Sequence, residues 1–285
     1  MKFDSNQAWQ QATAAVSANF SMLLPIAGVF FLVPSLVSTW FFGDMQAAML
    51  ANIANPQANE AMVQGMIGKF AGFGLAAMLV QSVGNMALLG LLTDRARPTV
   101  GEAIGNAVKS LPTVIGAIVL FIVAYFVVAL VAGIVIGGAA ALVKSMALTA
   151  ILAIAALVAV FYVLTKLSLT LPVIVIERVM NPATALTRSW QLTKGNSFRI
   201  FLFYLLLAIA YLVVAIVVFV ALGSLFGIGQ MAVGAAPPGS AALIGMGLLS
   251  GVLGAVVAMY LNAILAAVHR QLSGPSADAI SQTFG

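Results

Sequence analysis

The residues of this sequence that can do chemistry gather in one stretch, from Lys166 to Arg199. The whole chain has 19 charged residues, 12 basic and 7 acidic. Six of them lie in these 34 positions. They are Lys166, Glu177, Arg178, Arg188, Lys194 and Arg199. Guanidinium and ammonium groups bind phosphate oxygens through charge-assisted hydrogen bonds, and a carboxylate pairs with either of them. The stretch therefore predicts ion pairing and contact with an anionic surface rather than a reaction.

Four side chains of this stretch are predicted to contact lipid headgroups or a protein partner: Arg188, Trp190, Lys194 and Arg199. A basic residue near an anionic membrane surface contributes roughly 1 kcal/mol, and tryptophan prefers the membrane–water interface. Glu177 is expected to pair with Arg188 or Arg178 and so to fix one helix against its neighbours. A simpler interpretation also stands, in which these charges only anchor and orient the chain in a membrane.

Polar side chains inside long apolar runs form a second candidate set: Gln81, Asn85, Lys166 and Asn262. Gln81 and Asn85 are four residues apart, so they share one face of a helix. Such amides commonly form hydrogen bonds between helices, at about 0.6 kcal/mol per contact. The functional alternative is a polar seam that lines a path for a substrate, with Tyr125 contributing a hydroxyl.

The residue types that most enzymes need are scarce. The chain has one histidine, His269, and no cysteine. It contains no HExxH, GxSxG or Walker sequence and no histidine pair, and metal hydrolases need several clustered oxygen or nitrogen ligands. We therefore expect no enzyme activity, no metal and no cofactor. His269 is expected to mark the membrane interface beside Arg270.

Composition identifies the surroundings in which these residues must work. The chain is 63% hydrophobic and 7% charged, with a mean hydropathy of +1.14, whereas a soluble domain has about 25% charged residues. A bilayer must therefore surround most of the chain, and its continuous apolar runs predict helices rather than a barrel. We expect a single integral membrane domain over residues 1–285, with no cleavable signal peptide because the first 20 residues are polar.

Six membrane spans are predicted, at 21–42, 70–93, 113–137, 147–175, 198–222 and 241–268. One set of connecting segments, with both termini, holds nine basic residues, and the opposite set holds only Lys69 and Lys144. The nine are Lys2, Arg95, Arg97, Lys109, Arg178, Arg188, Lys194, Arg199 and Arg270. The positive-inside rule then predicts cytoplasmic termini. The basic net charge of +5 is explained in this way rather than by nucleic-acid binding.

The outer segments differ from the inner ones. Segment 43–69 is rich in Met, Ala and Asn, and the spacing of its apolar residues predicts short amphipathic helices on the outer surface. Segment 223–240 carries no charge and is rich in Gly and Pro. It is expected to be a flexible loop, in which Pro237 and Pro238 impose extended backbone.

The three segments that lead from the basic side into a pair of spans look alike. Each starts with a helix N-cap signal: Asp4 with Gln7, Thr99 with Glu102, and Asn181 with Pro182. An amphipathic run follows each signal, and the third run ends at Gly195. We predict an internal repeat of three hairpins, each preceded by an interfacial amphipathic helix on the cytoplasmic side.

The position of Lys166 depends on where the fourth span ends, because the run 147–175 is longer than a bilayer needs. If the span ends near 166, the ammonium group reaches the headgroups and 167–176 forms a shallow segment broken at Pro172. If the helix continues, Lys166 is buried at a cost of about 2.5–3.5 kcal/mol and needs a partner, of which Glu177 is the nearest acid in sequence. The first arrangement is favoured.

Part of the charged stretch also resembles a known family. Over 168–199 the chain is similar to the membrane domain associated with glycerophosphoryl diester phosphodiesterases and to related bacterial inner-membrane proteins. The matching positions are Leu171, Pro172, Glu177, Ala185, Leu186, Arg188, Ser189, Trp190, Leu192, Lys194, Gly195, Phe198 and Arg199. Some members fuse this domain to a soluble phosphodiesterase barrel with catalytic histidines. This chain lacks a histidine pair, so the resemblance implies a stand-alone membrane domain without that activity.

Together these observations predict an all-α, six-span protein of the bacterial inner membrane. It is expected to be non-enzymatic and to act through contacts with anionic lipids or proteins, in maintenance of the envelope. A membrane-protein partner or a second copy of the chain is the expected protein contact. The alternative is a small transporter, channel or lipid-handling protein whose path runs along the polar seam.

Overall fold

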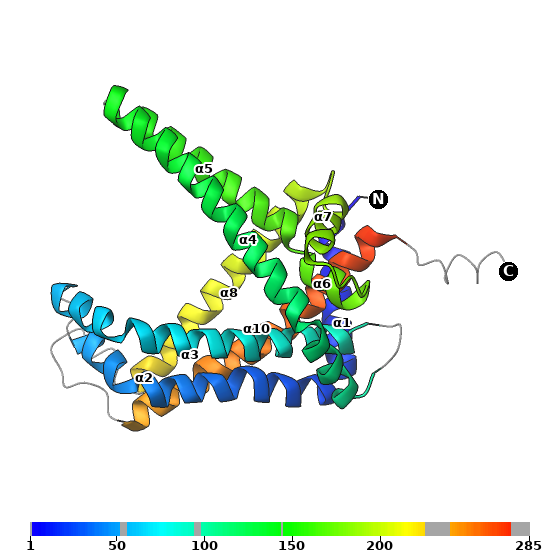
Figure 1. The fold of residues 1–285 in the computed structure, drawn as a ribbon. Helices are drawn as coiled ribbons and strands as arrows, with labels where there is room; N and C mark the ends of the chain where they lie inside the picture. The colour runs from blue at the N-terminus through cyan, green and yellow to red at the C-terminus, as the bar shows by residue number, and fades with distance from the viewer. Residues whose placement is uncertain (1, 52–55, 94–97, 144, 226–239, 275–285) are drawn as a thin grey trace. The chain divides into compact units, whose positions relative to one another are not determined.

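The structure is a computed structural model that describes residues 2–51, 56–93, 98–143, 145–225 and 240–274, and every regular element in these ranges is helical (Figure 1). The elements in chain order are α1 (Ser5–Ala27), the π-helix η1 (Gly28–Leu32), α2 (Val33–Ala51), α3 (Pro56–Leu91), α4 (Val100–Val143), α5 (Met146–Leu167), α6 (Thr170–Ile176), α7 (Pro182–Leu192), α8 (Ser197–Leu225) and α10 (Ser240–Ser273). The predicted all-helical class is therefore confirmed.

Within the part of the chain that the structure describes, six helical segments are long and apolar enough to cross a membrane, as predicted. They are Ser5–Gly43, Val63–Leu91, Val100–Gly138, Met146–Ile176, Ser197–Ala221 and Ala242–Ser273. A helix needs about 20 apolar residues to span the hydrocarbon core, so each segment exceeds this length. The predicted spans lie within these segments or overlap them almost completely.

Several predicted boundaries lie where no break occurs. The first two amphipathic runs are continuous with the helices that follow them. The first run lies within α1, and the second lies within α4, which passes through Pro112 without interruption. Only the third run forms a helix of its own, α7, because Gly195 after it has a φ of +83° and ends the helical path. The prediction of short, separate helices in 43–69 was wrong. This segment belongs to two long helices, because α2 extends to Ala51 and α3 begins at Pro56. Ala, Met and Gln favour continuation of a helix.

The three predicted N-caps are confirmed by hydrogen bonds. The Gln7 amide donates to the Asp4 carboxylate at 3.0 Å, and the Thr184 amide donates to the Asn181 side chain at 3.1 Å. A complete capping box starts α4, in which the Thr99 amide donates to Glu102 at 2.8 Å and the Glu102 amide donates to the Thr99 hydroxyl at 3.3 Å. Predictions that concern Arg95, Arg97, Lys144 and the Pro237–Pro238 loop lie outside the described residues.

The chain forms two compact units, and the prediction of a single membrane domain stays a prediction. The first unit comprises Met1–Ala12, Val108–Leu205 and Ile264–Gly285, and the second comprises Thr13–Ala107 and Leu206–Ala263. The first unit contains the whole charged stretch, and the second contains Gln81, Asn85 and Asn262.

In the second unit, glycines bring helices into close contact. A Cβ at Gly84 of α3 would overlap the Phe30 side chain of η1, and a Cβ at Gly251 of α10 would lie 3.1 Å from the Leu32 Cα. A Cβ at Gly247 would overlap the Thr39 side chain. Hydrogen bonds reinforce this contact, because the Ser35 hydroxyl donates to the Gly247 carbonyl at 3.0 Å. The Gly247–Gly251 motif therefore packs α10 against η1 and α2, as small residues do between membrane helices.

Replacement of Gly247 by alanine is expected to destabilise the second unit by about 1–3 kcal/mol, because the added methyl group must displace Thr39 in a packed contact. Gly254→Ala on the same helix is the matched control, since a Cβ there meets nothing within 4 Å and alanine favours the helix. Thermal unfolding in detergent measures both variants. Equal melting temperatures for the two would contradict the close helix contact at Gly247.

Candidate functional site

The site is built beside a break within the fourth candidate span, Met146–Ile176. α5 ends at Leu167 and α6 begins at Thr170, and the Ser189 side chain of α7 lies at the gap. The Ser189 hydroxyl donates to the Lys166 carbonyl at 2.8 Å and accepts from the Leu169 amide at 3.2 Å. Ser189 is fully buried, so it satisfies two backbone groups that the break would leave without a partner. The predicted break at Pro172 was therefore misplaced, because Pro172 lies within the first turn of α6, where its missing N–H is tolerated.

Lys166 is buried, with only 3% of its surface exposed. Its Nζ lies 5.5 Å from the ring centre of Tyr162 and 5.4 Å from that of Trp190. The two rings meet edge to face at 5.9 Å. The favoured prediction that Lys166 reaches the headgroups was wrong, because the helix ends here but α7 covers the side chain. Its partners are two aromatic faces, which attract a cation, and not Glu177.

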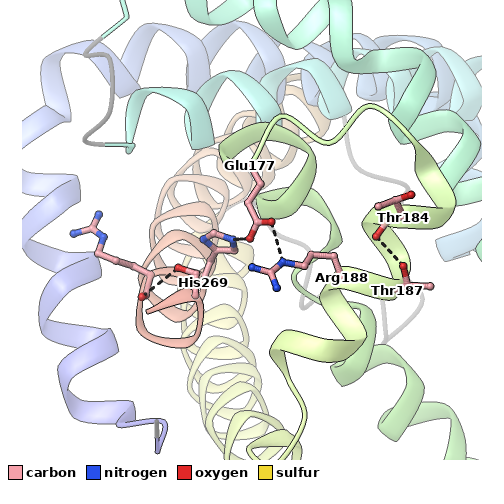
Figure 2. A network of polar contacts seen from close by, with 7 residues as sticks. Glu177, Thr184, Thr187, Arg188 and His269 are labelled. Atoms are coloured by element: carbon pink, nitrogen blue, oxygen red, sulfur yellow. Dashed lines mark hydrogen bonds and ion pairs between the residues drawn. The ribbon is translucent and has the colours of Figure 1, made fainter. Parts of the chain in front are cut away.

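Glu177 joins three elements of the first unit (Figure 2). It follows α6 directly, and its Oε2 accepts a hydrogen bond from Arg188 Nε of α7 at 2.9 Å. Its Oε1 lies 2.9 Å from His269 Nε2, near the end of α10. The side chain of His269 is 5% exposed and that of Arg188 is 40% exposed. Of the two partners that the sequence left open for Glu177, the structure selects Arg188 and adds His269.

Hydrogen bonds attach the N-terminal segment to two parts of the first unit near this contact. The Phe3 amide donates to the Asn196 side chain at 2.9 Å. The Asp4 amide donates to Gln271 Oε1, and Gln271 Nε2 donates back to the Asp4 carbonyl, both at 3.1 Å. The N-terminal segment thus connects the turn after α7 to the end of α10, which Figure 1 shows close to the N-terminus.

The charge state of Glu177 follows from these contacts. Partial burial acts to raise its pKa, but the hydrogen bonds and positive charges of Arg188 and His269 outweigh burial and hold the pKa below its ordinary value of 4.5. The carboxylate is therefore ionised at neutral pH. Its stabilising effect is present above the unfolded pKa of 4.5 and is lost as the pH falls through the lower pKa of the folded state.

Acidification below about pH 4.5 is accordingly expected to lower the melting temperature of the wild type more than that of Glu177→Gln, whose amide does not titrate. Glu60→Gln, an exposed position on α3, serves as the control and should follow the wild type. Melting curves between pH 6 and pH 3 (about the range of carboxyl titration) measure the difference. Parallel pH profiles for the wild type and Glu177→Gln would contradict the ion-pair role.

A pocket of about 280 Å³ lies beside this network. Its lining comes from α7, from the turn after it and from the end of α10: Arg188, Gln191, Leu192, Lys194, Asn196 and Leu272. Two of these side chains are cationic, two are amides and two are apolar. The set contains no acidic residue, so the pocket's chemistry fits an anion with a small apolar part.

The structure separates the four predicted headgroup contacts. Arg188 and Lys194 line the pocket, whereas Trp190 covers Lys166 and retains 40% exposure. Arg199 is exposed on α8 and is not among the pocket's lining residues. Arg178 is exposed at a φ of +57°, so it forms the turn between α6 and α7 in a conformation that few non-glycine residues adopt.

The predicted polar seam is partly assembled in the second unit. Asn262 is 1% exposed, and its Nδ2 donates to Asn85 Oδ1 at 2.7 Å and to the Ala258 carbonyl at 2.8 Å. This pairing is the interhelical hydrogen bond that the sequence offered as the simpler alternative. Gln81 lies half-buried one turn before Asn85, and Tyr125 is 48% exposed in the other unit.

Four participants were not predicted from the sequence: Ser189, the latch whose hydroxyl bonds the Lys166 carbonyl and the Leu169 amide, His269 as a partner of Glu177, and the amides of Gln191 and Asn196. One signal for the Glu177–His269 contact was available. Glu177 is the single acidic residue between Glu102 and Asp278, and a lone carboxylate next to apolar spans needs a partner. In the described ranges, no three His, Asp or Glu side chains gather where they could hold a metal ion.

Comparisons with known proteins bear on the part of the chain that carries this site. A search of curated proteins and a search of solved structures each give no match. A family model does match, over residues 140–273, which contain α5 to α10 and the whole Lys166–Arg199 stretch. The resemblance inferred from the sequence is thereby confirmed: residues 140–273 match the family described as the membrane domain of glycerophosphoryl diester phosphodiesterase.

Proposed function

We propose that this chain is a non-enzymatic protein of the bacterial inner membrane that acts through contacts with anionic lipid headgroups, in maintenance of the envelope. The observation that carries the proposal is the placement of Arg188 and Lys194. Both line one pocket, and both lie in sequence between two candidate spans, Met146–Ile176 and Ser197–Ala221. Basic groups at the ends of spans lie at the depth of the lipid phosphates.

The proposed membrane arrangement follows from charge. Three hairpins cross the bilayer with both termini in the cytoplasm, where nine of the twelve basic residues then lie. In this arrangement α7 is an interfacial helix on the cytoplasmic side. Trp190 and the exposed Phe198 supply aromatic groups at the interface, which tryptophan and other aromatic residues favour.

The test is lipid retention in native mass spectrometry. The triple variant Arg188→Gln, Lys194→Gln, Arg199→Gln should lose its preference for phosphatidylglycerol over phosphatidylethanolamine by at least about tenfold, since each charge contributes roughly 1 kcal/mol. Lys69→Gln, an exposed lysine on α3, is the control for the opposite side and should leave the preference unchanged.

An unchanged preference in the triple variant would contradict the lipid role. The same surface would then be assigned to a protein contact, and chemical cross-linking in native membranes would separate a second copy of the chain from another membrane protein. A further consequence of the proposal is that the purified protein releases no product from glycerophosphodiesters, which an enzymatic assay checks directly.

A further inference from the structure

We propose that the pocket lined by Arg188, Gln191, Leu192, Lys194, Asn196 and Leu272 is a discrete site that binds one phosphate ester group. The inference rests on the proposed function and deepens it. General attraction of anionic lipids needs only net positive charge near the membrane. A site, in contrast, depends on the geometry of particular donors, so charge and geometry can be tested separately.

The lining offers donors from more than one direction. Arg188 projects from α7, and Lys194 comes from the turn that follows, which Gly195 makes possible at its φ of +83°. Guanidinium presents a planar fork that fits two phosphate oxygens, and ammonium acts as a compact charge for another. A tetrahedral phosphate accepts from both directions at once, whereas a planar carboxylate is satisfied by the arginine fork alone.

Glu177 positions the arginine. Its Oε2 accepts a hydrogen bond from Arg188 Nε at 2.9 Å, and its Oε1 lies 2.9 Å from His269 Nε2, which holds the carboxylate in place. Figure 2 shows the guanidinium lying against Glu177 through this one nitrogen. Among the described residues, Arg188 forms its ion pair through Nε. The edge of the guanidinium formed by its two terminal nitrogens is therefore the part that can bind a ligand in the pocket.

The walls of the pocket are fixed before any ligand arrives. Asn196 holds the Phe3 amide on one wall, and Gln271, next to Leu272, exchanges two hydrogen bonds with Asp4 on the other. Adjacent residues of the N-terminal segment therefore join both walls. Pre-organisation of this kind reduces the ordering cost of binding, and it distinguishes a site from a set of surface lysines.

The size of the pocket limits what it can hold. Its volume of about 280 Å³ lies just below the range of about 300–1,000 Å³ that accommodates drug-sized ligands. A phosphate with a short polar or apolar substituent fits this space, with Leu192 and Leu272 beside the carbon atoms. The same chemistry occurs in a phospholipid headgroup and in a soluble phosphate ester, so the experiment must separate the two sources.

The decisive variant is Arg188→Lys, which keeps the net charge but removes the fork. Gln191→Ala removes an exposed amide of the lining, so it tests the site without disturbing the core. Thr187→Ala is the matched control on the same helix, because its hydroxyl donates only to the Ala183 and Thr184 carbonyls of α7. The full chain is placed in nanodiscs of phosphatidylcholine with or without phosphatidylglycerol, and inorganic phosphate is titrated into the discs that lack it.

The expected result is retention of one phosphatidylglycerol per chain, with affinity at least tenfold weaker in Arg188→Lys and Gln191→Ala and unchanged in Thr187→Ala. Binding of inorganic phosphate with the same dependence on Arg188 and Gln191, and no retained phosphatidylglycerol, would support the site and assign it to a soluble ligand. That outcome would overturn the proposed lipid function.

Wild-type affinity in Arg188→Lys and Gln191→Ala, or binding in neither arm, would overturn the site. Lipid preference that persists in these two variants and is lost in the triple charge variant would leave the proposed function standing.

Discussion

Trp190→Ala is expected to lower the free energy of unfolding by about 2–4 kcal/mol, the largest effect we predict for one substitution. Large-to-small changes of this kind cost about 3–5 kcal/mol for a buried tryptophan, and Trp190 retains 40% exposure. The cost has a second source. The ring faces Lys166 Nζ at 5.4 Å, and its loss removes one of the two aromatic partners of a charge that is 3% exposed, the other being the Tyr162 ring.

A double-mutant cycle separates the two sources. Lys166→Met should be close to neutral or stabilising, because an apolar side chain of similar shape replaces a desolvated charge. Trp190→Ala combined with Lys166→Met should then cost less than Trp190→Ala alone, by the cation–π energy of roughly 1–2 kcal/mol. Trp40→Ala is the control for tryptophan loss, since Trp40 is 84% exposed.

Melting temperatures in one detergent, followed by light scattering, provide the four corners of this cycle. Strict additivity between the two positions would show that the ring contributes only packing and that Lys166 has no interaction with it. A Trp40→Ala variant that melts as low as Trp190→Ala would point to a general loss of detergent contact instead.

Ser189→Ala is expected to cost about 2–3 kcal/mol, and its effect comes from the backbone. The hydroxyl satisfies the Leu169 amide and the Lys166 carbonyl at the break between α5 and α6. A buried donor or acceptor left without a partner costs about 1–3 kcal/mol. The Lys166 carbonyl keeps a longer bond from the Thr193 hydroxyl at 3.4 Å, so the amide of Leu169 bears most of the loss.

Thr187→Ala is again the matched control, because it removes a hydroxyl from the exposed face of the same helix. The melting temperature of Ser189→Ala should fall by roughly 4–6 °C and that of Thr187→Ala by much less. Hydrogen exchange gives an independent measurement, in which the Leu169 amide loses protection in Ser189→Ala alone. Unaltered protection at Leu169 would contradict the latch.

Local sequence patterns were sufficient for the elements that depend on local physics. Six apolar runs predicted six candidate spans because a bilayer-sized helix is apolar along its whole length. The N-caps at Asp4, Thr99 and Asn181 were predictable because a cap is formed by residues two or three positions apart. The end of α7 was predictable from Gly195, whose φ is positive.

Helix continuity was harder to predict, since apolar composition does not distinguish a break from a continuation. α4 runs through Pro112, while the shorter run after Met146 breaks at Ser168 and not at Pro172. The position of the break at Ser168 depends on Ser189, which is 20 residues beyond Leu169 and supplies the missing partner of the Leu169 amide. A bond of this kind cannot be inferred from the residues on either side of the break.

By itself, the sequence determined the class of this protein, its candidate spans, its helix starts and the stretch in which its charges gather. Composition and neighbouring residues set these properties, and both are visible in the chain. The tertiary structure alone decided which charges meet. It brought Glu177 to Arg188 and His269, covered Lys166 with two rings, and placed Arg188 and Lys194 in one pocket that Leu272 also lines. The contacts of Glu177 with Arg188 and His269 join residues 11 and 92 positions apart, and Trp190 lies 24 positions beyond Lys166. Packing between helices, which has no local sequence signature, determines these contacts.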